Sequence, residues 1–233
     1  MKQLKTLMLA TGLLAFGMAH AQNVDEIINR YLDSLGGKAK IGALKSAIYY
    51  GNLDYQGSFF PATVYRVQDK GYKFSVDAQG TSNYVMVTDK GMWTYIPAQG
   101  QAAPEAAPAD QAKLSMGNLD LQGPLYNYKQ KGSKVEFAGK DSVDGRIANK
   151  IKLSTKDGIA TTYYIDAETS KLLMTRMSVS QNGQSVDVDR KFGDYRRVDG
   201  ILFPFRFDNT YGNVVVDKVE VNKPIEDSVF KNN

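Results

Sequence analysis

The sequence has no cysteine, and its one histidine, His20, lies in an N-terminal segment that we expect to be removed. A chain without thiols or imidazoles has no thiolate nucleophile, no histidine-based triad, no ordinary zinc site and no disulfide. No glycine-rich phosphate loop and no calcium-loop spacing occurs either. We therefore predict that the protein is not an enzyme and holds no metal or cofactor. The alternative is an enzyme that uses carboxylates, Tyr or Lys, which would require several such groups to converge in a cleft, and the sequence gives no sign of this.

Long apolar runs and a one-sided charge are also missing. Nothing after the N-terminal segment approaches the roughly 18 consecutive apolar residues of a membrane-spanning helix. The formal net charge is +4 for the whole chain, and Lys2 and Lys5 belong to the segment expected to be removed. So small a surplus gives no electrostatic basis for binding nucleic acid or an anionic membrane surface.

The first 21 residues have the pattern of a signal peptide. Lys2 and Lys5 form a basic start, residues 7–16 form an apolar core, and Ala19-His20-Ala21 supplies the small-x-small cleavage pattern. We predict a signal peptide over residues 1–21, removed by cleavage after Ala21. Gln22 follows, where lipid modification would need a cysteine, so we expect an unlipidated protein in a bacterial periplasm.

The remaining chain, residues 22–233, opens with an amphipathic helix. Asn23 is a good N-cap, Glu26 stands in the capping-box position, and Gly36-Gly37 ends the helix. Steps of three and four place one set of residues on a single face: Val24, Ile27, Ile28, Tyr31, Leu32 and Leu35. This face covers a core or serves as a lid over the mouth of a sheet. A second, shorter helix is predicted over residues 38–45.

From Ile48 onward the hydrophobic period changes to two, which is typical of half-buried strands. Turn signals such as Asp144-Gly145 and Asn182-Gly183 recur at short intervals. The pattern predicts roughly ten strands in an antiparallel meander. Two sets of alternate residues are predicted to face inward. They are Tyr72, Phe74 and Val76, and Ile201, Phe203, Phe205 and Phe207.

One segment interrupts the meander. Residues 98–112 are rich in Ala, Gln and Pro and are predicted to form a mobile loop, and residues 114–128 to form short helical or irregular structure over the sheet. The loop has no composition that suggests a separate domain. We therefore predict a single domain over residues 22–233.

The residues that could contact a ligand are mostly aromatic or contain sulfur. Methionines suit adaptable binding surfaces but also fill cores, and aromatic residues either line a cavity or pack. Arg176 would meet a lipid head group if it faces inward, although a surface position is the simpler interpretation, as is a solvated face for Asp187 and Asp189. The candidate cavity-lining residues are Tyr65, Tyr72, Phe74, Tyr84, Met86, Trp93, Tyr95, Met174, Arg176, Met177, Phe203 and Phe205.

The order of short motifs along the chain resembles a known family. A signal peptide leads into a helix that ends Leu35-Gly36-Gly37, and a series of turn and strand motifs follows. The series is Leu44-Lys45-Ser46, Gly51, Gly91-Met92-Trp93, Gly123-Pro124-Leu125, Gly139, Val143, Gly145, Tyr164-Ile165-Asp166, Asp194-Tyr195-Arg196, Gly200 and Pro204. This order resembles the outer-membrane lipoprotein-sorting proteins of the LolA/LolB-type lipid-binding superfamily, particularly divergent Bacteroidota-type members.

The resemblance implies a mainly β fold with α: an incomplete antiparallel β-barrel, formed by a curved meander sheet and covered by short helices over a hydrophobic cavity. It also implies a periplasmic carrier that binds lipoprotein acyl chains or other lipids for transfer toward the outer membrane. Its partners would be an inner-membrane transporter and an outer-membrane acceptor. The alternative is a periplasmic sensor or scaffold of the same fold that binds a protein partner.

Overall fold

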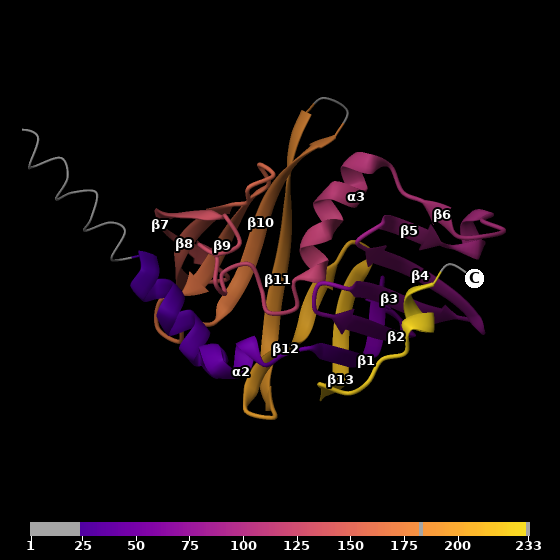
Figure 1. The fold of residues 1–233 in the computed structure, drawn as a ribbon, viewed down its shortest axis with the longest axis horizontal. Helices are drawn as coiled ribbons and strands as arrows, with labels where there is room; N and C mark the ends of the chain where they lie inside the picture. Colours follow the sequence, from indigo (N-terminus) through magenta and orange to yellow (C-terminus); the bar gives the residue numbers. More distant parts are fainter. Residues whose placement is uncertain (1–23, 182–183, 232–233) are drawn as a thin grey trace, which may run out of the picture. The chain divides into compact units, whose positions relative to one another are not determined.

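The computed structural model describes residues 24–181 and 184–231 (Figure 1). The predicted signal peptide, residues 1–21, lies outside them. Contacts divide the chain into two compact units, which we treat separately. The first unit contains the chain up to Ser34 together with Asn127–Asp189, and the second contains Leu35–Tyr126 together with the chain from Arg190 onward. Within the described ranges, no helix has the length and apolarity needed to cross a membrane.

Thirteen strands form one antiparallel sheet, in the order β6-β5-β4-β3-β2-β1-β13-β12-β11-β10-β9-β8-β7. The order leaves β6 and β7 as edges, so the sheet is open. The strands are β1 (Ser46–Tyr55), β2 (Ser58–Val67), β3 (Gly71–Ala78), β4 (Thr81–Thr88), β5 (Gly91–Tyr95), β6 (Glu105–Ala106), β7 (Lys134–Val143), β8 (Arg146–Ser154), β9 (Ala160–Asp166), β10 (Leu172–Gln181), β11 (Gln184–Val198), β12 (Ile201–Asn209) and β13 (Gly212–Val221). The expected mainly antiparallel β fold with short helices is confirmed, with more strands than the ten predicted.

The short helices differ from the prediction in two places. A first helix covers 24–35, as expected, but α2 (Lys38–Gly42) ends three residues before Lys45. The segment 98–112, predicted as a mobile loop, contains the strand β6, which pairs with β5, and the start of α3 (Ala109–Ser115). Three 3-10 helices complete the set: η1 (Pro97–Gln99), η2 (Met116–Leu119) and η3 (Asp227–Phe230).

The second unit is built around one apolar core. Its strands β1 to β4, β12 and β13 place alternate side chains on the same face, as the period of two predicts. The core residues are Leu44, Ala47, Tyr49, Leu53, Ala62, Val64, Phe74, Leu121, Ile201, Phe203, Phe205, Val214, Val216, Val219 and Val221. Only Leu44 and Leu121 come from outside the strands, so the core is largely one face of the sheet.

A bulge between β1 and β13 keeps this face in register. Tyr50 pairs with Lys218 but Gly51 pairs with Val216, so Asp217 is the extra residue. A Cβ added at Gly51 would lie 2.1 Å from the carbonyl oxygen of Val215. Only glycine therefore allows this close approach of the two backbones.

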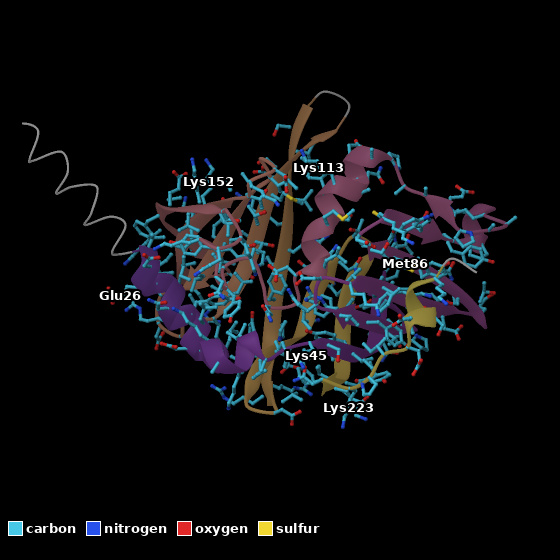
Figure 2. The ribbon with its side chains drawn as sticks, viewed as in Figure 1. Glu26, Lys45, Met86, Lys113, Lys152 and Lys223 are labelled. Atoms are coloured by element: carbon cyan, nitrogen blue, oxygen red, sulfur yellow. The ribbon has the colours of Figure 1, made fainter. Side chains whose placement is uncertain are left out.

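The C-terminal segment crosses the opposite face of the same sheet. Phe230 lies against Gly71, where an added Cβ would come 2.6 Å from its ring, and Lys70 forms an ion pair with Asp227. At the other end of the segment the Asn222 side chain accepts a hydrogen bond from the Lys45 N–H at 2.8 Å, and Lys45 and Lys223 lie near one another (Figure 2). The segment is thus anchored at both ends.

In the first unit, the helix 24–35 is held by polar contacts at both ends. The Tyr128 hydroxyl donates to Asp25 at 2.7 Å, and the Ser34 hydroxyl donates to the Ser170 carbonyl at 3.0 Å. Its apolar face is buried, as predicted, through Val24, Ile27, Ile28 and Leu32. On β7 to β10 the buried residues Val143, Ala148, Tyr164, Leu173 and Met174 form a separate cluster.

Asp166 is a buried carboxylate at the β9–β10 turn, with only 3% of its surface exposed. It accepts hydrogen bonds from the Glu168 and Thr169 N–H groups at 3.0 and 2.6 Å and from the Thr169 hydroxyl, and Arg146 lies 2.8 Å away. Burial opposes ionisation, but these donors and the Arg146 guanidinium outweigh it, so the pKa of Asp166 lies below its usual value.

The edge strand β7 is poorly suited to pairing with another chain. Its register with β8 shifts between Phe137 and Lys140, and Gly139 within this bulge has a positive φ of 88°. Lys134 and Lys140 are exposed on the same strand. Bulges and lysines are features that block strand addition at sheet edges.

Replacing Gly51 should destabilise the second unit. We expect Gly51→Ala to lower the free energy of unfolding by roughly 2 kcal/mol, because the new methyl group overlaps backbone atoms that cannot move aside. Urea unfolding measures the change. Gly193→Ala is the control, since no heavy atom lies within 4 Å of a Cβ there. Equal stability of the two variants would contradict the close-packed bulge.

The Asp166 carboxylate should make stability depend on acid pH. A carboxyl group whose folded-state pKa is lowered stabilises the fold fully above its unfolded pKa of about 3.9, and this contribution disappears as the pH falls through the folded pKa. We expect Asp166→Asn to lower the free energy of unfolding by about 2 kcal/mol at pH 7. The difference from wild type should shrink below about pH 4. Asp157→Asn, in an exposed turn, should show neither effect in the same urea titrations.

Candidate functional site

The strand pairing divides the second-unit sheet into two faces. One cross-strand row runs Tyr49, Val64, Phe74, Val85 and belongs to the side that carries the core, which we call the inner face. The neighbouring row runs Ile48, Tyr65, Lys73, Met86, Trp93 on the other side, which we call the outer face. Because side chains alternate, a residue of one row cannot reach the ligand of the other.

The predicted site residues of this unit lie on both faces. Tyr72, Phe74, Phe203 and Phe205 belong to the inner face, and the last three of them are core residues. Five others belong to the outer face: Tyr65, Tyr84, Met86, Trp93 and Tyr95. The structure therefore brings four of the candidates together around one core and separates them from the other five.

The outer-face candidates form an aromatic group of their own. The Tyr84 and Tyr95 ring centroids are 5.6 Å apart, and the Lys73 ammonium lies 4.1 Å from the Tyr84 ring centroid. Burial lowers the pKa of Lys73. Met86 (labelled in Figure 2) is 1% exposed, so it packs within the protein instead of presenting its sulfur to a ligand.

The remaining candidates belong to the first unit and alternate along β10. Met174 pairs with Tyr164 and Arg176 with Thr162, whereas Met177 has the opposite parity. The Arg176 guanidinium donates twice to Asp189, at 2.7 Å each, and Asp187 lies 3.8 Å away. The Asp189 hydrogen bonds are the main reason that the pKa of Arg176 is raised. Arg176 is thus engaged with carboxylates of its own unit, and Met174 belongs to that unit's buried cluster.

The inner face of the second unit is aromatic and is incompletely covered. The Tyr49 ring meets Phe203 and Phe207 edge-on, with centroids 6.0 and 6.3 Å apart. Four further residues pack against the core but remain partly exposed: Tyr72, Val76, Val198 and Phe207. Apolar surface therefore continues from the closed core to accessible positions on the same face.

Arg66 is a charged residue on this face, as is Arg196, which lies 4.6 Å from the Phe205 ring centroid; sequence reasoning missed Arg66. It pairs with Ala47 on one side and Tyr72 on the other, both inner-face positions. Its Nη2 donates to the carbonyls of Asn118 and Asp120, both at 3.1 Å, while its Nε is buried and has no hydrogen-bond partner. The signal in the sequence is a charge at inward parity after Ala62 and Val64.

The segment that Arg66 holds covers part of the inner face. Gln122 donates from its side chain to the carbonyls of Gly42 and Leu44, and its N–H donates to Gln68. Leu121 is its contribution to the core. We call residues 116–122 the cover segment. It is fixed to the sheet by polar contacts and by one buried leucine.

Two tyrosine hydroxyls near Arg66 are strongly desolvated. Burial raises the pKa of Tyr49, and the positive charge and hydrogen bond of Arg66 act against the rise. Burial also raises the pKa of Tyr72, opposed by Arg66 and Arg190. Both tyrosines are therefore neutral hydrogen-bonding groups in an apolar, electropositive setting.

Comparisons with known proteins identify the fold. No protein-family model matches the sequence, and no curated protein matches it. A solved LolA superfamily protein from Nitrosomonas europaea is similar, with 11% identity over 91% of this chain and 97% of that chain and a TM-score of 0.54. A putative outer membrane lipoprotein-sorting protein domain from Vibrio parahaemolyticus has 12% identity, coverage of 88% and 94%, and a TM-score of 0.51. At such identities the similarity concerns the fold alone, and the chain has the fold of the LolA superfamily.

Proposed function

We propose that the protein is a periplasmic carrier that binds the acyl chains of lipoproteins or other lipids and delivers them toward the outer membrane. The observation that carries the proposal is the inner face of the second unit, where accessible aromatic residues continue an apolar core. Its fold is also that of a putative lipoprotein-sorting domain.

Binding would be driven by desolvation of the acyl chain. Each methylene group that leaves water contributes about 0.8 kcal/mol. In this proposal Tyr72 would contact such a chain, with Phe207 beside it. The predicted site residues Phe74, Phe203 and Phe205 are buried in the core and would reach the chain only when the face opens. No catalytic group is needed for this role, and no metal or cofactor.

The cover segment would control access to the inner face. It is held mainly by hydrogen bonds from Arg66 and Gln122, which water can replace when the segment moves. Leu121 would then leave the core, and an acyl chain would take its place. Loading and release would follow contact with an inner-membrane transporter and an outer-membrane acceptor.

Lipid should remain bound to the protein purified from a periplasmic fraction. Native mass spectrometry combined with lipid extraction should recover acyl chains in near-stoichiometric amounts. A lipid-free protein that also ignores added fatty acids and lipopeptides would contradict the carrier function. It would favour the alternative of a sensor or scaffold that binds a protein partner.

Two phenylalanines near the same end of the sheet allow a matched test. Phe207 is a partly buried inner-face residue, whereas Phe59 is 63% exposed and has outer-face parity. We expect Phe207→Ser to weaken binding of a fluorescent fatty acid about tenfold, because an aromatic contact is worth roughly 1–2 kcal/mol. Phe59→Ser should leave the affinity unchanged. Equal losses in both variants would place the ligand elsewhere.

A further inference from the structure

We propose that the Arg66 guanidinium binds the anionic head group of an amphiphile whose chain lies on the inner face. The proposal rests on the carrier function and narrows its substrate class to lipids with a carboxylate or a phosphate. It concerns the second unit alone.

The first argument is the charge balance around Arg66. None of the ion pairs formed by the described residues includes Arg66, and its Nη2 donates to the neutral carbonyls of Asn118 and Asp120. The nearby Asp120 carboxylate instead accepts from Gln68 at 3.4 Å. Arg66 is partly buried, and a cation that has lost part of its hydration is costly without an opposite charge. An anion from outside the chain would remove that cost.

The second argument is the unused donor. The Arg66 Nε is buried and lacks a partner, although a guanidinium presents its N–H groups as a fork that fits two oxygen atoms of one carboxylate or phosphate. Both carbonyls of the cover segment accept from Nη2, so the Nε–H group is not accounted for by them. An anionic oxygen atom would satisfy this N–H group, and a second oxygen of the same anion could replace a carbonyl at Nη2.

The groups around Arg66 are also suited to an anionic head group. The charged groups that act most strongly on the Tyr72 hydroxyl are Arg66 and Arg190, and no carboxylate is among them. Arg66 also lowers the pKa of the Tyr49 hydroxyl against the effect of burial, and the Tyr49 ring contacts Phe203 and Phe207. A head group at Arg66 would thus lie between neutral hydroxyls, with its chain running over the phenylalanines.

The test compares ligands that share one chain and differ in the head group. Equilibrium dialysis at pH 8.5 with hexadecanoate, hexadecyl phosphate and hexadecan-1-ol should show that both anions bind the wild-type protein at least about tenfold more tightly than the alcohol, as a charge-assisted hydrogen bond predicts. The ranking of the two anions separates a fatty acid from a phospholipid as the source. Acetate and inorganic phosphate alone should not compete, because the chain supplies most of the affinity.

Variants test whether Arg66 is the residue that gives the protein its preference for anions over the alcohol. Arg66→Gln should bring the anion-to-alcohol ratio close to one with little change for the alcohol, and Arg66→Lys should keep part of the preference. Arg206→Gln, an exposed outer-face arginine of β12, should keep all of it. Equal binding of acid and alcohol by the wild type would overturn the head-group site while leaving the carrier intact. Failure of all three ligands to bind would overturn the carrier function itself.

Discussion

The pairing of β1 with β13 is the constraint on which the second unit depends. All other neighbours in the strand order are consecutive in sequence, whereas Ala47 pairs with Val221 and Asp54 with Asn213. The loop-closure entropy of joining such distant segments must be offset by burial along the whole ladder. The bulge at Gly51 makes this possible, because it returns Val214 and Val216 to the side of Tyr49 and Leu53. Without that shift, valines of β13 would alternate out of the core.

The polar groups on the inner face depart from its otherwise apolar composition. They lie where the cover segment contacts the sheet. A face built for stability alone would place an aliphatic residue at Arg66, because even a partly buried ion loses favourable hydration. The chain instead uses Arg66 to hold the carbonyls of Asn118 and Asp120. The cover segment is therefore joined to the sheet partly by hydrogen bonds, whereas the strands beneath it are joined by packed aliphatic and aromatic side chains.

The sequence predicted the features that depend on the local hydrophobic period. It failed where both faces of a strand carry similar apolar residues. The face of the helix 24–35 follows from residues three and four apart, and the strand alternation of Ile201 to Phe207 gives the correct inward side. In β3 to β5 both sides carry bulky residues, since Met86 and Trp93 of the outer row are as apolar as Phe74 and Val85 of the inner one. Because η3 and Phe230 also cover part of the outer face, alternation could not separate ligand-facing positions from the others.

Tertiary contacts explain the remaining differences. Nothing in the composition of residues 98–112 favours a strand, yet Glu105–Ala106 pairs with β5. The Ala107 N–H also donates to the Met92 carbonyl at 2.9 Å. These bonds come from the neighbouring edge and not from local propensity. Arg66 was missed for a similar reason, since its partners lie about fifty residues further along the chain.

The shape of the β7 edge has a consequence for how the protein behaves when crowded. At high concentration, an open sheet offers each copy of a chain a template onto which another copy could add a strand. The kink at Gly139 and the flanking lysines interrupt the row of free N–H and carbonyl groups after a few residues. The β7 edge of the open sheet is therefore a poor template for fibril growth.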